Sequence, residues 1–380
     1  FLRFRLNEFI APPIFFPPVP LRVVTIEGLD WTTCRNLYRF EKEHLRLFYD
    51  LLRNLGMPAN FGRFNSEWCF LLLLKWLATG ESYTLLAMNT FGVEATQISR
   101  ALYQIIEWVH DNVARQKMHS NIAAFVPRFP MYAQKIRAKV LMNARSTNIA
   151  AQQDDQAPEW KRTVLNNLPN PYRVIGFLDG TQQWIAVPGA GPIGGGPNAP
   201  RREDAWEIQR AFFSRKAHAH TALKYITCVA PDGITMYCSE PYSGRNHDVN
   251  VLDRIGLNLQ MVDAQPNIAM GHRKILYGDL AFGEEECIRR AHPPPQTNAQ
   301  LLENSSLNAC RTSVEHEYGQ VLNLFKGLRC WWTHHAGSRV TRVQFVVTTF
   351  IYNCYVCCYN NQLSTYYDCQ APSLADYLRP

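Results

Sequence analysis

The stretch that decides the fold is Tyr172-Arg-Val-Ile-Gly-Phe-Leu-Asp179-Gly-Thr181, near the middle of the 380-residue chain. An apolar run that stops at an acid and a glycine predicts a buried strand, a turn, and a second strand over 184–187. Downstream, the sequence predicts a hairpin over 225–238, a helix from Asp248 to Leu259, a short buried strand over 275–277, and a long helix from Thr312 to Leu328. This order predicts an α/β fold, a mixed sheet flanked by helices.

Three helices are predicted ahead of this region. The first runs from Ser66 to Thr79, the second is capped by Ser82 and stops at Phe91-Gly92, and the third begins at 94–97. Two helices joined by a short turn, the second with polar residues in its first turns, form the helix-turn-helix pattern of DNA-binding domains. Small three-helix cores without DNA affinity share this pattern. On the DNA-binding interpretation, the contact residues are Gln97, Ser99 and Arg100.

These elements divide the chain into five predicted parts. A polar stretch over 146–158 marks the boundary between the helical part and the α/β part. The first predicted part, residues 1–60, is an N-terminal extension that includes a helix. It is followed by an all-α helix-turn-helix domain at 61–150, a linker at 151–171, an α/β domain at 172–360, and a tail at 361–380.

The charge of the chain is unevenly distributed. The formal net charge is +7, and residues 1–150 hold 18 basic and 11 acidic side chains, so they carry the whole excess. Residues 151–380 hold 21 of each sign. A basic region beside a neutral one predicts binding to a polyanion such as DNA, with a solvated helix face as the alternative.

Eleven cysteines, an odd number, do not resemble an extracellular disulfide framework. The apolar neighbours of Cys354, Cys357 and Cys358 predict burial in a helix in preference to a zinc site. The scattered cysteines predict reduced thiols in an intracellular protein. No apolar stretch reaches the length of a membrane span, so we expect no membrane partner. Gly189-Ala-Gly191-Pro-Ile-Gly194 matches a dinucleotide-binding fingerprint, but prolines follow it where a helix is needed, which predicts a loop.

Four acids lie where chemistry would place them. Asp179 and Asp279 each follow an apolar run, Asp248 lies in Gly244-Arg-Asn-His-Asp248, and Glu315 lies inside the late helix. Strand ends hold carboxylates in fixed geometry with their oxygens exposed at the sheet edge. Because Mg²⁺ and Mn²⁺ prefer hard oxygen ligands, three such acids from separate segments could hold two ions for phosphoryl chemistry.

Each acid also has an ordinary structural interpretation. An Asp after a strand is commonly a turn former or a helix cap, and Asp248 could begin its helix with His247 beside it. Glu315 could be a solvated helix residue, and we expect Glu317 to be one, since residues two apart on a helix point to different faces. Only the joint arrangement favours catalysis.

Together these segments resemble the DDE transposases of the PIF/Harbinger superfamily, whose catalytic core is RNase H-like. The resemblance covers 165–360 clearly and 66–114 more loosely. It departs from the family at the Gly- and Pro-rich 189–200 and at 357–360, where the family often has Leu-His-Asn. The matching pieces are Phe177-Leu-Asp-Gly-Thr181, the hairpin region from Lys216 to Cys238, Ser243-Gly-Arg-Asn-His-Asp-Val-Asn-Val-Leu252, Gly278-Asp-Leu-Ala-Phe282, Arg311-Thr-Ser-Val-Glu-His-Glu-Tyr-Gly319 and Phe325-Lys-Gly-Leu-Arg329.

The resemblance implies a DNA transposase that cleaves the ends of its element and joins them to target DNA. Asp179, Asp279 and Glu315 match the catalytic acids and would ligate two Mg²⁺ or Mn²⁺ ions. Asp248 and His247 match an accessory element, in which metal ligation by Asp248 is left open. It also implies double-stranded DNA as substrate, a homo-oligomer, a Myb-like DNA-binding partner protein, and a nuclear location. Basic residues expected to contact DNA phosphates, with plain solvation as the alternative, are Lys216, Arg245, Lys326 and Arg329.

Two other functions fit the same residues. One is a domesticated DNA-binding or protein-recruiting factor with a silent core, because a sequence shows ligands and not turnover. The other is a general nuclease, which would cleave DNA without terminal repeats.

Overall fold

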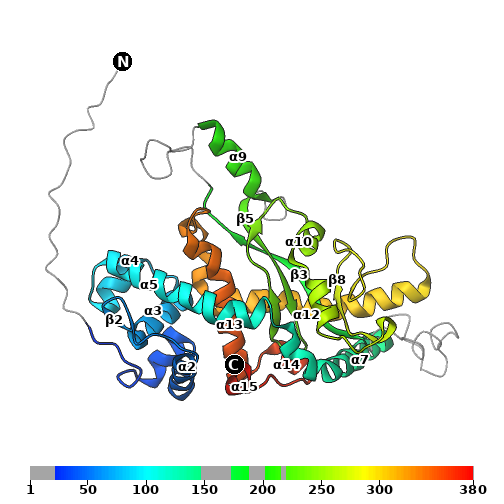
Figure 1. Ribbon diagram of the computed structural model, residues 1–380, viewed down its shortest axis with the longest axis horizontal. Coiled ribbons are helices and arrows are strands. Elements are labelled where there is room, and N and C mark those ends of the chain that lie inside the picture. The colour runs from blue at the N-terminus through cyan, green and yellow to red at the C-terminus, as the bar shows by residue number, and fades with distance from the viewer. Residues whose placement is uncertain (1–21, 147–172, 188–201, 215–219, 380) are drawn as a thin grey trace.

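The computed structural model describes residues 22–146, 173–187, 202–214 and 220–379 (Figure 1). The predicted linker at 151–171, the Gly- and Pro-rich loop at 189–200 and Lys216 lie outside the described residues. Among the described helices, none is both long and apolar enough to span a lipid bilayer.

A mixed sheet forms the centre of the C-terminal half. The central strand β3 pairs with β5 in antiparallel and with β8 in parallel orientation, and β8 pairs in parallel with β9. Strands β4, β6 and β7 all pair with β5. This mixed α/β topology is consistent with an RNase H-like core. The strands are β3 Val174–Trp184, β4 Phe213–Ser214, β5 His220–Val229, β6 Thr235–Cys238, β7 Tyr242–Ser243, β8 Ile275–Gly278 and β9 Ile288–Arg290.

The prediction of a strand break at Asp179 was wrong. Strand β3 continues to Trp184, because β5 pairs with it without interruption from Phe177 opposite Val229 to Trp184 opposite Ala222. This pairing bonds the backbone that a turn at 179–181 would have exposed. Asp179 therefore projects from the middle of a long strand.

The predicted hairpin is confirmed, whereas two predicted helices have different bounds. The predicted helix at 248–259 is two helices, divided at Gly256, whose φ of 61° favours glycine. The long helix begins at Asn298 with a capping box between Thr297 and Gln300, and it ends at Leu324. The helices of this half are α9 Arg202–Phe212, α10 Asp248–Ile255, α11 Leu257–Asp263, η7 Met270–His272, α12 Asn298–Leu324, η8 Lys326–Arg329, η9 Trp331–Thr333, α13 Arg339–Tyr359, α14 Gln362–Tyr367 and α15 Leu374–Leu378.

The three predicted N-terminal helices are present at the predicted positions. Asn65 caps the first, with its Oδ1 accepting from the Trp68 N–H at 2.7 Å, and Gly80 and Gly92 end the first and second in the left-handed conformation. The elements are α1 Trp31–Thr33, η1 Cys34–Tyr38, α2 Lys42–Asn54, β1 Asn60–Phe61, β2 Phe64–Asn65, α3 Ser66–Thr79, α4 Tyr83–Leu86, η2 Ala87–Phe91, α5 Ala95–Val109, η3 His110–Ala114, α6 Arg115–Met118, η4 Ile122–Arg128 and α7 Phe129–Ser146. Their DNA-binding role stays a prediction.

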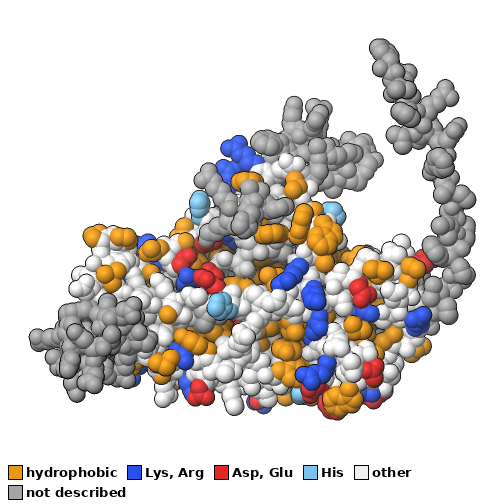
Figure 2. Space-filling model, turned by 180° about the vertical axis from the view of Figure 1, so that it is seen from behind, with side chains coloured by type: hydrophobic (Ala, Val, Ile, Leu, Met, Phe, Trp, Pro, Cys, Tyr) orange, Lys and Arg blue, Asp and Glu red, His pale blue; other side chains and the backbone are white. Residues whose placement is uncertain are grey.

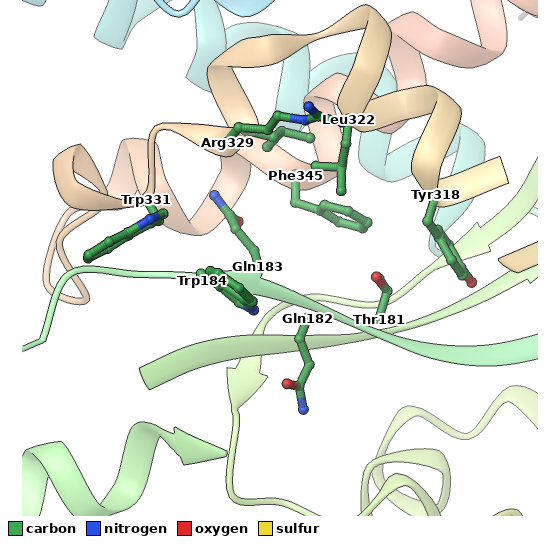
Figure 3. A pocket seen from close by; sticks show the side chains of 10 residues that line it. Thr181, Gln182, Gln183, Trp184, Tyr318, Leu322, Arg329, Trp331 and Phe345 are labelled. Atoms are coloured by element: carbon green, nitrogen blue, oxygen red, sulfur yellow. The ribbon is translucent and has the colours of Figure 1, made fainter. Parts of the chain in front are cut away.

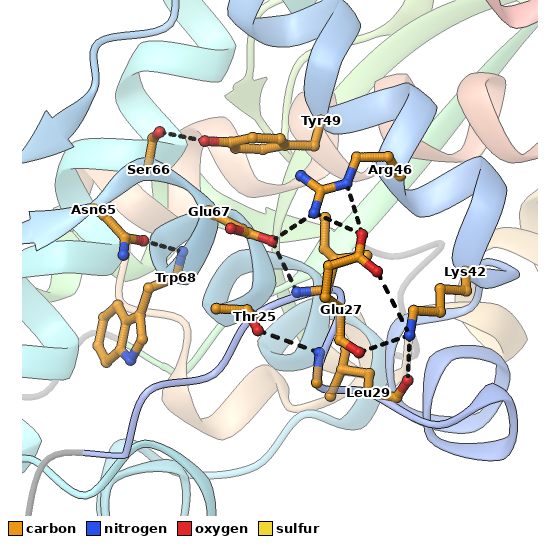
Figure 4. Close-up of polar contacts among 12 residues, drawn as sticks. Thr25, Glu27, Leu29, Lys42, Arg46, Tyr49, Asn65, Ser66, Glu67 and Trp68 are labelled. Carbon is orange, nitrogen blue, oxygen red and sulfur yellow. Dashed lines mark hydrogen bonds and ion pairs between the residues drawn. The ribbon is translucent and has the colours of Figure 1, made fainter.

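A polar network joins the first described segment to these helices (Figure 4). The Ile26 N–H donates to Glu67 Oε1 at 2.8 Å, and the Arg46 guanidinium lies 2.9 Å from Glu27 and 3.4 Å from Glu67. Lys42 donates to the carbonyl oxygen of Glu27 at 2.7 Å. The network fixes residues before α1 against α2 and α3.

One hydrophobic core runs through the helical half and the sheet. Helix α13 contributes fourteen buried residues and packs against both α5 and β6, as its central position in Figure 1 indicates. Cys354 is fully buried on this helix, and Cys357 and Cys358 are half-buried. Helix α7 packs against β3 and α12. The predicted domain boundaries therefore separate segments that share a core, and they stay predictions.

Much of the N-terminal basic charge is used within the molecule. Lys135 lies 2.7 Å from Asp368, and Arg128 lies 3.1 Å from the buried Asp232. On the face shown in Figure 2, Lys and Arg side chains form separate groups with acidic side chains between them. On this face, the excess does not form one continuous basic surface.

Candidate active site

Strands β3 and β8 bring two of the predicted acids together. The strands are parallel neighbours, and Phe177 lies opposite Tyr277. Two residues further along each strand, Asp179 within β3 and Asp279 just after β8 therefore lie side by side. The Asp279 Oδ1 accepts from the Ala281 N–H at 2.8 Å, which holds this carboxylate in a turn directly after β8.

Glu315 reaches the same place from α12, through an arginine. The Arg311 Nη1 lies 2.7 Å from Glu315 Oε1 and 3.7 Å from Asp179 Oδ1. The side chains of Arg311 and Asp179 are 15% and 18% exposed, and that of Glu315 is 44% exposed. Arg311 is one helical turn before Glu315, the spacing at which helical side chains meet.

The pKa of Asp179 reflects burial and the negative charge of the neighbouring acids. Burial raises its pKa to about 6, Arg311 opposes the rise, and the neighbouring charges of Glu315 and Asp279 add to it. Repulsion among acids in a partly buried site favours a bound cation. Here Arg311 supplies that cation for two of the three carboxylates.

The three carboxylates offer the hard oxygen donors that Mg²⁺ and Mn²⁺ prefer, so their chemistry fits such an ion. In the part of the chain that the structure describes, however, no three His, Cys, Asp or Glu side chains are grouped closely enough to hold a metal ion. The guanidinium of Arg311 lies between Asp179 and Glu315. These two acids could share an ion only after Arg311 moves.

Asp248 lies on the opposite face of β3 from Asp179, paired with a lysine. It is the first residue of α10, and its Oδ1 lies 2.8 Å from Nζ of Lys224, with both side chains buried. A Cβ added at Gly180 would be 2.8 Å from the same oxygen, so Asp248 packs directly against β3. His247 is exposed at the helix start, and its side chain makes no capping hydrogen bond.

The predicted DNA-contacting residues lie in separate parts of the structure and differ in exposure. Arg245, Lys326 and Arg329 are all exposed, and the last two share the turn after α12. On α5, Arg100 is exposed, whereas Gln97 is half-buried and accepts a hydrogen bond from Arg63.

Ser99 is half-buried on the same helix. Gln97 and Arg100 are three residues apart and share a face, and Ser99 points elsewhere.

Sequence reasoning missed Arg311 and Lys224 and misplaced Glu317. The i,i+4 spacing of Arg311 and Glu315 was a usable signal, whereas nothing local marks Lys224 as the partner of Asp248. Glu317 was expected in solvent, but it is 1% exposed. Its Oε1 accepts from Asn361 Nδ2 at 2.6 Å, and burial raises its pKa to about 8. The end of α13 and the start of α14 cover this side of α12.

Residues 198–358 match the family model described as DDE superfamily endonuclease. The match includes Asp248, Asp279 and Glu315, and Asp179 precedes it. No curated protein and no solved structure matches the chain. Together with the sheet topology, the family match supports a DDE-type, transposase-like nuclease.

Proposed function

We propose that the protein is a Harbinger-type DNA transposase, which cleaves a strand at the ends of its element and joins the freed 3′ hydroxyl to target DNA. The observation that carries the proposal is the convergence of Asp179, Asp279 and Glu315 from two parallel strands and one helix. Acids fixed on rigid elements suit metal-dependent phosphoryl transfer.

The three acids have one shared role in this proposal. Asp179, Asp279 and Glu315 hold two Mg²⁺ or Mn²⁺ ions, which when bound activate the attacking oxygen and stabilise the leaving oxygen. Arg311 neutralises Asp179 and Glu315 in the protein without metal and releases them when metal binds. Asp248, held by Lys224, is an accessory residue that supports β3 beside Asp179.

DNA binding is assigned to two regions. Exposed Arg245, Lys326 and Arg329 contact phosphates near the acids, which positions the strand without reading its sequence. On α5, Arg100 and Gln97 share a face suited to DNA contact, and Ser99, on another face of the helix, is the third proposed contact. The proposal also includes a homo-oligomer, a Myb-like partner protein and a nuclear location, which rest on the family resemblance alone.

A non-catalytic, transposase-derived binding factor is the second candidate, and one observation favours it. Arg311 already supplies a positive charge between Asp179 and Glu315. In a silent core, this guanidinium would replace the metal permanently. Titration calorimetry with Mn²⁺ separates the two, because the transposase takes up Mn²⁺ and loses that uptake on Asp179→Asn, whereas the silent factor takes up none.

A strand-transfer assay with element ends and Mn²⁺ tests the leading proposal. Wild-type protein should cleave and join the ends, and both Glu315→Gln and Asp279→Asn should abolish the two steps. Asp263→Asn, an exposed acid at the end of α11, is the matched control and should retain them. Cleavage that persists in Asp279→Asn refutes the site, and equal cleavage of DNA without terminal repeats indicates a general nuclease.

A further inference from the structure

A cavity of about 330 Å³ opens beside the acids, between the end of β3 and the segment that follows α12 (Figure 3). Trp184 and Trp331 lie at one end of it, and Thr181 and Tyr318 lie at the other. The ring of Phe345 faces the space between them. The proposed catalytic residues do not themselves line this cavity.

The cavity lies on the same side of the sheet as Asp179. Side chains alternate along a strand, so Asp179, Thr181 and Gln183 share one face of β3. Two residues of strand span about 7 Å, so the cavity begins within about two nucleotide steps of the acids. The hydroxyl of Tyr318 hydrogen-bonds that of Thr227, the residue opposite Asp179 in β5.

The lining suits a flat ring with polar edges. The indole rings of Trp184 and Trp331 line the cavity, and the Thr181 hydroxyl offers a hydrogen-bonding group at its other end. The buried Gln183 amide is already bonded to His334 and Tyr225, and the ring of Phe345 stacks on Tyr225. Proteins hold unstacked bases between aromatic side chains and hydrogen-bond their edges. The volume is at the low end for a small-molecule site, roughly 300 Å³ and upward, which fits a single planar group.

Positive charge lies at the same cavity. Arg329 lines it and is exposed, and Lys326 is exposed one turn earlier. A nucleotide carries its phosphate next to its base, so a ligand with both groups matches this combination of rings and cations. A base within a duplex cannot enter an enclosed cavity unless it leaves the stack.

We propose that this cavity binds one unpaired nucleobase of the DNA strand whose backbone lies at the acids. The base stacks on Trp331 and Trp184, its edge faces Thr181, and Arg329 contacts the adjoining phosphate. The inference rests on the proposed function, since it needs DNA at the acids. It adds that the substrate is distorted, with a base extruded near the cleaved bond.

Equilibrium binding in EDTA tests the inference apart from catalysis. The probes are a fluorescent duplex with one unpaired thymine and the same duplex fully paired. Wild-type protein should prefer the first, and Trp331→Ala should reduce that preference about tenfold, since one base stack is worth roughly fivefold to 150-fold. Trp331→Phe, which keeps a ring, should retain most of it.

Trp31→Ala is the matched control, because Trp31 lies in α1, is 52% exposed and is outside the lining of the cavity. It should leave the preference unchanged. Photo-crosslinking from 5-iodouracil at the unpaired position should label residues of the cavity.

Equal wild-type affinity for the two duplexes, a preference that survives Trp331→Ala, or crosslinks outside the cavity would each overturn the inference. These results leave the metal-dependent cleavage assay untouched. Failure to bind either duplex would overturn both the inference and the proposed transposase.

Discussion

Replacing Arg311 with methionine should strengthen Mn²⁺ binding. The arginine lies between two of the three acids, so a metal ion must displace its guanidinium before Asp179 and Glu315 can share that ion. Methionine keeps a long, flexible, apolar side chain and removes the charge. The competing cation is then absent.

The size of the effect follows from the geometry. The exposed pair with Glu315 contributes about 0.3–0.5 kcal/mol, as such helical pairs do. Charges 3.7 Å apart, as in Arg311 and Asp179, attract by about 4 kcal/mol at an effective dielectric constant of 20, before desolvation is subtracted. We expect Arg311→Met to favour Mn²⁺ binding by about 2 kcal/mol net, which lowers the Kd for Mn²⁺ about 30-fold.

The pH of the measurement matters. Burial raises the pKa of Asp179 to about 6, and Arg311 holds it below the value that burial and the other acids would set. Without Arg311 the pKa rises further, and a protonated Asp179 ligates metal poorly. Titration calorimetry with Mn²⁺ should therefore be done near pH 8, where this competition from protons is weaker.

Arg379→Met is the matched control, since Arg379 forms a similar 2.7 Å pair with Asp376 near the C-terminus. It should leave Mn²⁺ affinity unchanged. An Arg311→Met affinity equal to or weaker than that of wild type would refute the reasoning. Absence of Mn²⁺ uptake by both the wild type and the Arg311→Met protein would favour the non-catalytic factor.

Three further predictions concern stability. Glu317 has a pKa of about 8 in the folded protein, against an ordinary 4.5. The folded protein is therefore less stable as the pH rises between these two values. Glu317→Gln should flatten this pH dependence of the unfolding free energy. Gly180→Ala places a Cβ 2.8 Å from Asp248 Oδ1 and should lower the free energy of unfolding, measured in urea, by about 1–3 kcal/mol. Tyr132→Phe removes a 2.6 Å hydrogen bond to the buried Asp232 and should lower the free energy of unfolding by about 1.5–3 kcal/mol. The loss should be measured as a lower thermal unfolding temperature.

Each has a control. Gly271→Ala adds a Cβ with no neighbour within 4 Å and should be near neutral, so equal losses at both glycines would disprove the steric argument. Tyr49→Phe removes a neutral bond of 2.8 Å to Ser66 and should cost less than Tyr132→Phe. A Glu317→Gln protein with the wild-type pH profile would show that Glu317 is not the titrating group.

Local patterns in the sequence were enough to predict many elements and the type of fold. The bounds of α3, the cap at Ser82, the turn at Gly92 and the hairpin around 231–233 depend on residues close together in the chain, and these predictions are confirmed. The mixed α/β class followed from the order of the elements, because few topologies accommodate that order.

Contacts between distant segments decided the rest. β5 extends β3 past Asp179, and the end of α13 with the start of α14 buries Glu317, although neither change is marked in the residues themselves. The acids were candidates from sequence alone. Only the parallel pairing of β3 with β8 places Asp179 beside Asp279, and only the packing of α12 on the sheet puts Arg311 between Asp179 and Glu315, because charge and burial depend on what lies near in space.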